Sequence, residues 1–128
     1  YVQLPGLFEQ SDYISLHCPL TKDNAGFVNN DLLQYMKPTA CIINTARGQL
    51  INEQHLANAL NNDRIGGAAL DVLSNEPPPA NNPLLTAKNC IITPHNAWTS
   101  KEARQRVMDI TTDNVRAFLQ QKPVNRVR

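Results

Sequence analysis

Five side chains suited to acid–base or anion chemistry lie within or soon after short apolar stretches: His17, Arg47, Asp71, Glu76 and His95. An arginine presents a planar fork of N–H donors that can hold a carboxylate through two parallel hydrogen bonds. A histidine can carry a proton near neutral pH, and a carboxylate beside it orients the ring and favours the protonated form. These residue types together suit an anionic substrate whose carbonyl or hydroxyl group must gain or lose a proton.

Each of these residues also has an ordinary structural explanation. Arg47 alone is equally suited to pair with a nearby acid, and a histidine within an apolar stretch, such as His17, is more often a hydrogen-bonded core residue. Asp71 could cap a turn, and Glu76 before three prolines could be a solvated loop residue. His95 after a proline could order a turn, although its place at the entry to a predicted helix favours a functional role. The arrangement of all five in the fold therefore decides between the two explanations.

Four short apolar runs are the elements that would position these side chains, at residues 13–18, 40–45, 66–72 and 89–93. Each run has the length of a strand and is nearly continuous in apolar residues. This pattern predicts strands that are buried on both faces, as in a parallel sheet covered by helices on either side.

Helical patterns separate the first three runs. Residues 29–36 and 52–63 carry apolar side chains at helical spacing, with Asn29 or Asn30 and then Asn52 as the predicted N-caps. Strands that alternate with helices indicate βαβ units with right-handed crossovers.

The second half of the chain differs in pattern. The prolines within residues 74–88 exclude a regular helix over much of that stretch and predict a loop with at most one turn. Residues 99–121 predict one long helix, in which Thr99 and Glu102 fit a capping box.

The predicted sheet would bring the chemically active residues together. In an open parallel sheet, ligands bind outside the carboxyl ends of the strands. His17 lies at the end of the first predicted strand and Arg47 follows the second. Asp71 lies at the end of the third with Glu76 after it, and His95 follows the fourth. We therefore expect these side chains to converge on one edge of the sheet, where a cleft opens and a cation need not be buried.

Composition narrows the class of protein. The 128 residues are 41% hydrophobic and 18% charged, with a net charge of +1 and scattered acids and bases, so neither a nucleic-acid nor a membrane partner is expected. Three cysteines, Cys18, Cys41 and Cys90, stand at long spacings without a Cys/His cluster. They are predicted to be reduced thiols of a cytosolic protein without a metal site. His55, among polar neighbours in a helical pattern, is predicted to be exposed.

Several segments in succession resemble the D-isomer-specific 2-hydroxyacid dehydrogenases, and most closely their glycerate dehydrogenase/hydroxypyruvate reductase branch. The segments are SDYISLHCPLT, NTARGQLINEQHLANAL, GGAALDVLSNEPP, NPLL and ITPHNAW. The resemblance implies an α/β fold, the second half of a doubly wound parallel (Rossmann-type) sheet plus a long C-terminal helix. Residues 1–98 would be part of an NAD(P)-binding domain. Residues 99–128 would be a C-terminal helix and tail that return toward a substrate domain.

The same resemblance implies roles for individual residues. Arg47 would hold the carboxylate of a small 2-oxo acid, His95 would exchange a proton with its oxygen at C2, and Glu76 would stabilise the imidazolium form of His95. The cofactor would be NAD or NADP. Its implied contacts are His17, Pro19, Thr21, Thr45, Ala46, Arg47, Asp71, His95 and Ala97.

The implied enzyme is a cytoplasmic homodimer that reduces hydroxypyruvate or glyoxylate to D-glycerate or glycolate. The family's G-x-G-x-x-G loop would precede this chain, so the chain alone is expected to bind the dinucleotide weakly and to be inactive. One alternative is a non-enzymatic, dinucleotide-sensing scaffold or corepressor on the same fold. Retention of Arg47, Glu76 and His95 together favours the enzyme.

Overall fold

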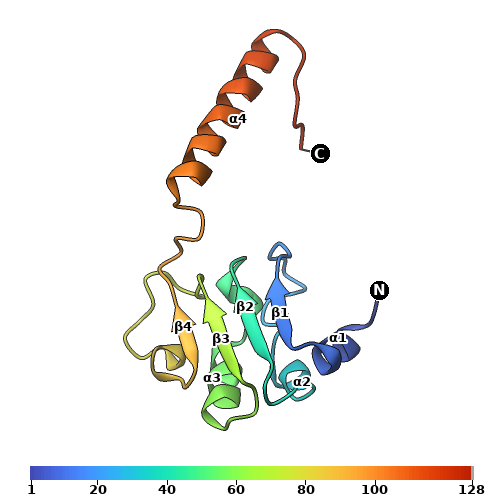
Figure 1. The fold of residues 1–128 in the computed structure, drawn as a ribbon, viewed down its shortest axis with the longest axis vertical. Helices are drawn as coiled ribbons and strands as arrows, with labels where there is room; N and C mark the ends of the chain where they lie inside the picture. Colours follow the sequence, from blue (N-terminus) through green and yellow to red (C-terminus); the bar gives the residue numbers. More distant parts are fainter. Residues whose placement is uncertain (128) are drawn as a thin grey trace. The chain divides into compact units, whose positions relative to one another are not determined.

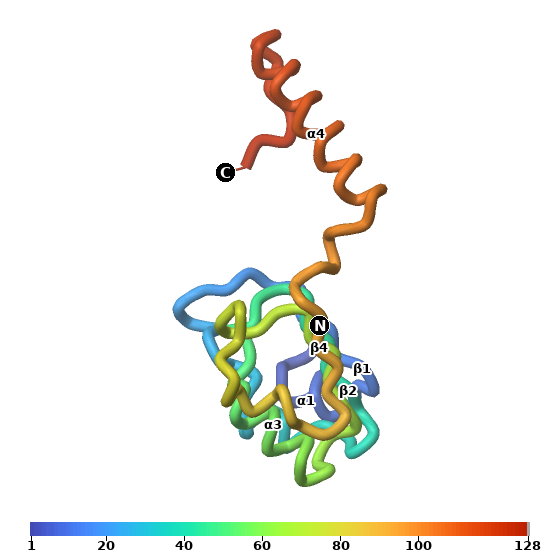
Figure 2. Tube along the Cα trace, turned by 90° about the vertical axis from the view of Figure 1, so that its left-hand side faces the viewer, coloured from blue at the N-terminus to red at the C-terminus, as the bar shows by residue number. Residues whose placement is uncertain are grey.

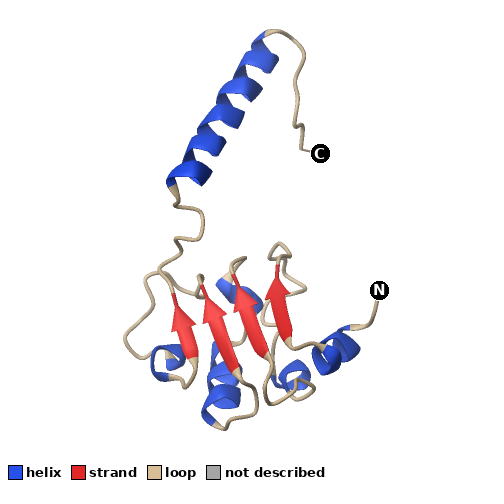
Figure 3. Cartoon of the chain, in the orientation of Figure 1, coloured by secondary structure: helices blue, strands red, loops and turns tan. Residues whose placement is uncertain are grey.

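A four-stranded parallel sheet lies at the centre of the first part of the chain (Figures 1 and 3). In this computed structural model, which describes residues 1–127, the strands follow one another across the sheet in sequence order. They are β1 (Tyr13–Leu16), β2 (Cys41–Asn44), β3 (Gly67–Leu70) and β4 (Cys90–Ile92). The predicted fold, a parallel Rossmann-type sheet followed by a long helix, is confirmed.

Helix α1 (Leu4–Gln10) precedes β1, and short helices connect the strands: α2 (Asn30–Leu33), α3 (Glu53–Asn61), and the 3-10 turns η1 (Gly48–Leu50) and η2 (Pro83–Thr86). The predicted caps are confirmed, because Asn29 accepts a hydrogen bond from Asp31 N–H and Asn52 accepts one from His55 N–H. The proline-rich loop 74–88 contains no α-helix, as predicted, but it has two turns where at most one was expected: η2 and a turn in which Asn82 N–H donates to the carbonyl of Pro79. His55 is half-buried instead of exposed, because its Nδ1 accepts the N–H of Asn30 from the neighbouring helix.

Within the first unit, residues 1–95, the connecting helices cover only one face of the sheet, so the prediction of strands buried on both faces was wrong for this unit. Ile14 and Leu16 of β1 point into the core, whereas Tyr13 is 73% exposed, and Ile91 of β4 is 68% exposed. Figure 2 shows α3 on one side of the strands. The reason is topological: right-handed crossovers that always step the same way across the sheet place every connecting helix on the same face.

The core lies between the sheet and these helices. It joins apolar side chains of the strands to those of all three helices, among them Phe8, Leu33, Ile42, Leu56 and Leu60. The three cysteines are half-buried and unpaired, and burial raises the pKa of the Cys90 thiol to about 11. A thiol with so high a pKa is protonated near neutral pH and is therefore a poor nucleophile.

The chain divides into two units after His95. The second contains α4 (Lys101–Leu119), which begins at a different cap from the one predicted. Ser100 caps the helix by accepting the N–H of Ala103, while the Thr99 hydroxyl donates to the carbonyl of Asn96. The predicted capping box of Thr99 and Glu102 was therefore wrong by one residue. No helix within residues 1–127 is both long and apolar enough to cross a membrane. The assignment of residues 1–98 and 99–128 to two domains stays a prediction.

Gly48, the first residue of η1, lies against the main chain of the loop after β3. A Cβ atom at Gly48 would meet the carbonyl carbon of Leu73 at 2.0 Å and its oxygen at 2.2 Å. Gln49 adds a hydrogen bond from its Nε2 to the carbonyl of Ser74, at 2.9 Å. Two loops from neighbouring strands are thus packed together without room for a side chain.

We predict that Gly48→Ala destabilises the first unit, because the clashing atoms belong to the main chain and cannot move as a flexible side chain would. The expected loss is on the order of 3 kcal/mol of unfolding free energy. Urea denaturation monitored by the amide NMR signals of β2 and β3 measures it. Gly6→Ala is the matched control: its Cβ would meet only Gln10 Nε2, at 3.8 Å. That helical substitution should stabilise by about 0.5–1 kcal/mol. Equal stability of the two variants would contradict the steric explanation.

Candidate active site

The chemically active residues gather at the carboxyl ends of the strands. Arg47 lies three residues after β2, Asp71 comes directly after β3, and His95 lies three residues after β4. Because β2, β3 and β4 are parallel neighbours, these three positions lie along the same edge of the sheet. The predicted convergence on one edge is thus present in the first unit.

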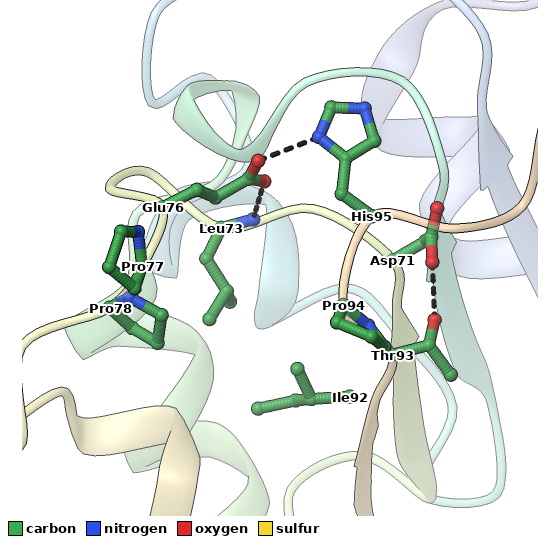
Figure 4. Close-up of a pocket in the computed structure, with 9 residues that line it drawn as sticks. All are labelled: Asp71, Leu73, Glu76, Pro77, Pro78, Ile92, Thr93, Pro94 and His95. Atoms are coloured by element: carbon green, nitrogen blue, oxygen red, sulfur yellow. Dashed lines mark hydrogen bonds and ion pairs between the residues drawn. The ribbon is translucent and has the colours of Figure 1, made fainter.

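Glu76 and His95 form a hydrogen-bonded ion pair in Figure 4. His95 Nδ1 lies 2.6 Å from Glu76 Oε2, and the N–H of Leu73 donates to Glu76 Oε1 at 3.0 Å. The His95 bond and then the Leu73 bond lower the pKa of Glu76 below its usual value, against weaker opposition from burial and from the charge of Asp71. The side chain of His95 is 44% exposed and that of Glu76 is 38% exposed, so water screens their attraction. A ligand that covered these two side chains and excluded water would strengthen the attraction between them.

The backbone also helps to aim the ring of His95. Its φ angle is +52°, in the left-handed region that residues other than glycine seldom adopt. Its N–H donates to the carbonyl of Thr93 at 3.0 Å. Such strained conformations concentrate at functional sites, where the surrounding structure holds them. The conformation at His95 is therefore a second observation, independent of the ion pair, that favours a functional role.

A pocket of about 380 Å³ opens beside this pair (Figure 4). Asp71, only 6% exposed, contributes a carboxylate that accepts a hydrogen bond from the hydroxyl of Thr93. The side of the pocket away from Asp71 is apolar and includes the prolines after a cis Glu76–Pro77 peptide bond. The lining residues are Asp71, Leu73, Glu76, Pro77, Pro78, Ile92, Thr93, Pro94 and His95.

Arg47 lines a different pocket, of about 640 Å³, at the ends of β1 and β2. This second pocket brings together four residues of the predicted cofactor site, His17, Pro19, Ala46 and Arg47. The guanidinium of Arg47 donates to the carbonyl of Ala46 at 2.6 Å and forms no ion pair within residues 1–127. An exposed arginine without an acidic partner is suited to bind an anionic ligand.

The remaining predicted cofactor contacts are less closely grouped. Thr21 and Thr45 are exposed and line neither pocket. The main-chain N–H of Thr21 donates to Asn24, which orders the loop after β1. Ala97 belongs to the second unit. The roles predicted for these three residues stay predictions.

Three polar residues shape the site without having been predicted to do so. Asn44, fully buried, accepts the N–H of Ala46 and donates to the carbonyl of Arg47, and so fixes the turn that carries the arginine. Thr93 donates to Asp71 and Ser15 bonds the Nε2 of His17. An asparagine at the end of an apolar strand signals such a turn. The Thr93–Asp71 bond joins two strands and has no local signal.

The chemistry of the site fits a nicotinamide dinucleotide. The carboxylate of Asp71 is a hydrogen-bond acceptor suited to an amide group, and the apolar wall of its pocket suits a flat ring. Arg47 and His17 offer hydrogen-bonding groups at the neighbouring strand ends for the polar parts of a ligand. No cluster of three His, Cys, Asp or Glu side chains within the described residues could hold a metal ion.

Comparisons with known proteins agree with this arrangement. Residues 1–97 match the family model for the NAD binding domain of D-isomer specific 2-hydroxyacid dehydrogenases. The hydroxypyruvate reductase of Blautia hydrogenotrophica is 51% identical over 98% of this chain and 39% of its own length. The glycerate dehydrogenase of Methylorubrum extorquens is 48% identical over 97% of this chain and 40% of its own length.

Solved structures show the same likeness. An acyclic imino acid reductase in complex with NADPH and D-Arg matches with a TM-score of 0.90 and 42% identity, over 99% of this chain and 40% of that chain. The D-lactate dehydrogenase of Lactobacillus jensenii with NAD⁺ matches with a TM-score of 0.89 and 28% identity, over 100% of this chain and 42% of that chain. This chain thus spans about 40% of the length of such relatives. It belongs to the D-isomer-specific 2-hydroxyacid dehydrogenases, a family of NAD(P)-dependent enzymes, and its first 97 residues match their NAD-binding domain.

Proposed function

We propose that this chain is part of an NAD(P)H-dependent reductase of small 2-oxo acids, with hydroxypyruvate or glyoxylate as substrate and D-glycerate or glycolate as product. The observation that carries the proposal is the Glu76–His95 pair, which lies in one pocket with the buried Asp71. The names of two relatives, hydroxypyruvate reductase and glycerate dehydrogenase, support the choice of substrate.

Each of the chain's own residues would have a separate task. Arg47 holds the carboxylate of the 2-oxo acid through its guanidinium fork. His95, in its protonated form, gives a proton to the substrate oxygen as negative charge develops there, and its neutral form removes that proton in the reverse reaction. Glu76 keeps the ring oriented and its carboxylate favours the imidazolium. Asp71 would accept a hydrogen bond from the carboxamide of the cofactor, and the cofactor would supply the hydride.

The substrate assignment is tested with the complete protein that carries this chain. Its reduction of hydroxypyruvate and glyoxylate with NADH and with NADPH should be measured, and the chain of residues 1–128 alone should give no turnover. Arg47→Gln should lower kcat/KM for the 2-oxo acid about 10- to 100-fold, because charge-assisted hydrogen bonds to the carboxylate are lost.

Lys37→Gln is the matched control for this arginine. It removes the same charge at the amino ends of the strands, where Lys37 pairs with Asp12 at 2.8 Å, and it should leave kcat/KM unchanged. If the protein binds the dinucleotide but reduces no 2-oxo acid, the scaffold alternative replaces this proposal.

We also propose that the enzyme is a cytoplasmic homodimer, as its resemblance to the family implies, and that the isolated chain of residues 1–128 dimerises separately through its sheet edge. Within residues 1–127, β1 pairs only with β2, so one side of β1 is an open sheet edge in the isolated chain, and open edges pair readily with other chains. Light scattering of residues 1–128 should report a dimer. Tyr13→Lys, which adds a charge on the exposed edge strand, should shift it toward the monomer, and Tyr35→Lys, away from the sheet, should not. A monomeric wild-type chain would contradict association through this edge.

The pH dependence of the ion pair can be derived from the lowered pKa of Glu76. A depressed carboxyl pKa contributes stability that is present above the ordinary value of 4.5 and is lost as the pH falls through the lower folded-state value. His95→Gln should therefore raise the pKa of Glu76 toward 4.5, by loss of the largest cause of the shift. Carboxyl ¹³C NMR of residues 1–128 measures it. His55→Gln, at a histidine bonded to Asn30 instead, should leave the pKa of Glu76 unchanged. If the pKa of Glu76 were equal in the wild-type chain, His95→Gln and His55→Gln, His95 would not be the cause of the lowered pKa.

A further inference from the structure

Glu53, the first residue of α3, uses both oxygens of its carboxylate to hold a loop that lies far from it in sequence. Oε1 accepts the N–H of Ser74 at 2.7 Å, and Oε2 accepts Nδ2 of Asn82 at 2.8 Å. Ser74 and Asn82 stand on either side of Glu76 in the sequence. One carboxylate therefore fixes both ends of the segment that carries Glu76.

The two partners of Glu53 are themselves constrained. Asn82 is only 5% exposed, and its Oδ1 accepts the N–H of Leu84 to cap η2, so its buried amide group needs an acceptor that Glu53 supplies. Ser74 is held on its other side, where Gln49 Nε2 donates to its carbonyl at 2.9 Å. Segment 47–53, which begins with Arg47, thus holds the Glu76 loop at Ser74 from two directions.

An ordinary helix-start role does not explain this arrangement. A first-turn glutamate usually stabilises its own helix through the helix dipole or by bonding a free N–H of the first turn. At α3 that capping is already supplied by Asn52, which accepts the N–H of His55. Both oxygens of Glu53 instead accept bonds from the loop 74–82. Its half-buried carboxylate forms no ion pair within the described part of the chain.

We propose that Glu53 is a positioning residue for the Glu76–His95 pair. The proposal rests on the proposed function, in which that pair handles the substrate proton. By fixing Ser74 and Asn82, Glu53 sets the path of the chain from Leu73 to Glu76. Leu73 N–H can then bind one oxygen of Glu76 while the other meets His95 Nδ1. Glu53 touches neither substrate nor cofactor in this role.

Glu53→Gln isolates this effect, because glutamine has the same size but only one acceptor oxygen. Its amide nitrogen would face either Ser74 N–H or Asn82 Nδ2, which are both donors, so one end of the loop is released. In ¹³C and ¹⁵N NMR of residues 1–128, the substitution should raise the pKa of Glu76 toward its ordinary value. It should also speed hydrogen exchange of the Leu73 amide about 10-fold or more. The amide signals of β2 and β3 should stay in place.

Glu102→Gln is the matched control: it makes the same change in the first turn of α4. It should leave both the pKa of Glu76 and the exchange of Leu73 unchanged. If Glu53→Gln also leaves both unchanged, the proposal is overturned. Loss of the β2 and β3 signals in Glu53→Gln would assign Glu53 to the stability of the whole unit and would likewise overturn it.

A second arm uses activity of the complete protein. Glu53→Gln should lower kcat and change its pH profile as Glu76→Gln does, with little change in KM, and should have no further effect in the Glu76→Gln background. If the double variant lost kcat by the product of the two single-variant factors, Glu53 would not act through Glu76. An inactive wild-type protein would remove the proposed function, while the NMR measurements would still decide whether Glu53 positions Glu76.

Discussion

Because Gly48 has no side chain, the main chain of the loop after β2 can pack directly against the main chain of the loop after β3. The loop after β2 carries Arg47, and the loop after β3 carries Glu76. Their main chains meet where Gly48 lies against Leu73, closer than any Cβ would allow. Leu73 in turn donates its N–H to Glu76, and Glu76 bonds His95. A single steric condition therefore links Arg47 to the Glu76–His95 pair, although the two line separate pockets.

The interaction between Glu76 and His95 matters more for the orientation it gives the two side chains than for the strength of their attraction. Glu76 and His95 are both partly exposed, so their attraction in water is modest. The effect of the pair is to fix the orientation of the His95 ring. One carboxylate oxygen of Glu76 bonds the ring, and the other accepts the main-chain N–H of Leu73. In the proposed function, a ring held in this way would need little reorganisation when the substrate binds, and such preorganisation is a principal source of catalytic power in enzymes.

Much of the first unit could be predicted from the sequence, because its signals are local. Apolar runs predicted the strands, and the amide side chains of Asn29 and Asn52 predicted the helix starts. The capping residue of α4 was misplaced because Thr99 and Ser100 are adjacent hydroxyl residues, and only the chain path shows which one faces Ala103 N–H. The covered face was also misjudged, since an apolar run does not reveal whether the chain itself supplies the second layer.

The candidate site was likewise predictable where its sequence signals are local and not where they depend on contacts between distant segments. Its members could be named from the polar residues at the end of each strand, but their grouping into two pockets could not. That grouping depends on contacts between distant segments, such as Thr93 with Asp71 and Glu53 with Ser74, which leave no periodic pattern in the sequence.

The consecutive strand order also shapes how the unit can assemble. Within residues 1–127, each strand pairs only with its neighbours in sequence order. Every parallel pair therefore closes a loop of roughly 20 to 30 residues, and no pair of these strands must bring the two ends of the sheet's chain together. The entropic cost of closure is therefore nearly the same at each step. Parallel sheets usually form slowly because their contacts are distant in sequence. Here the sheet can grow one strand at a time, and each added strand pairs with an edge already formed by the strand before it.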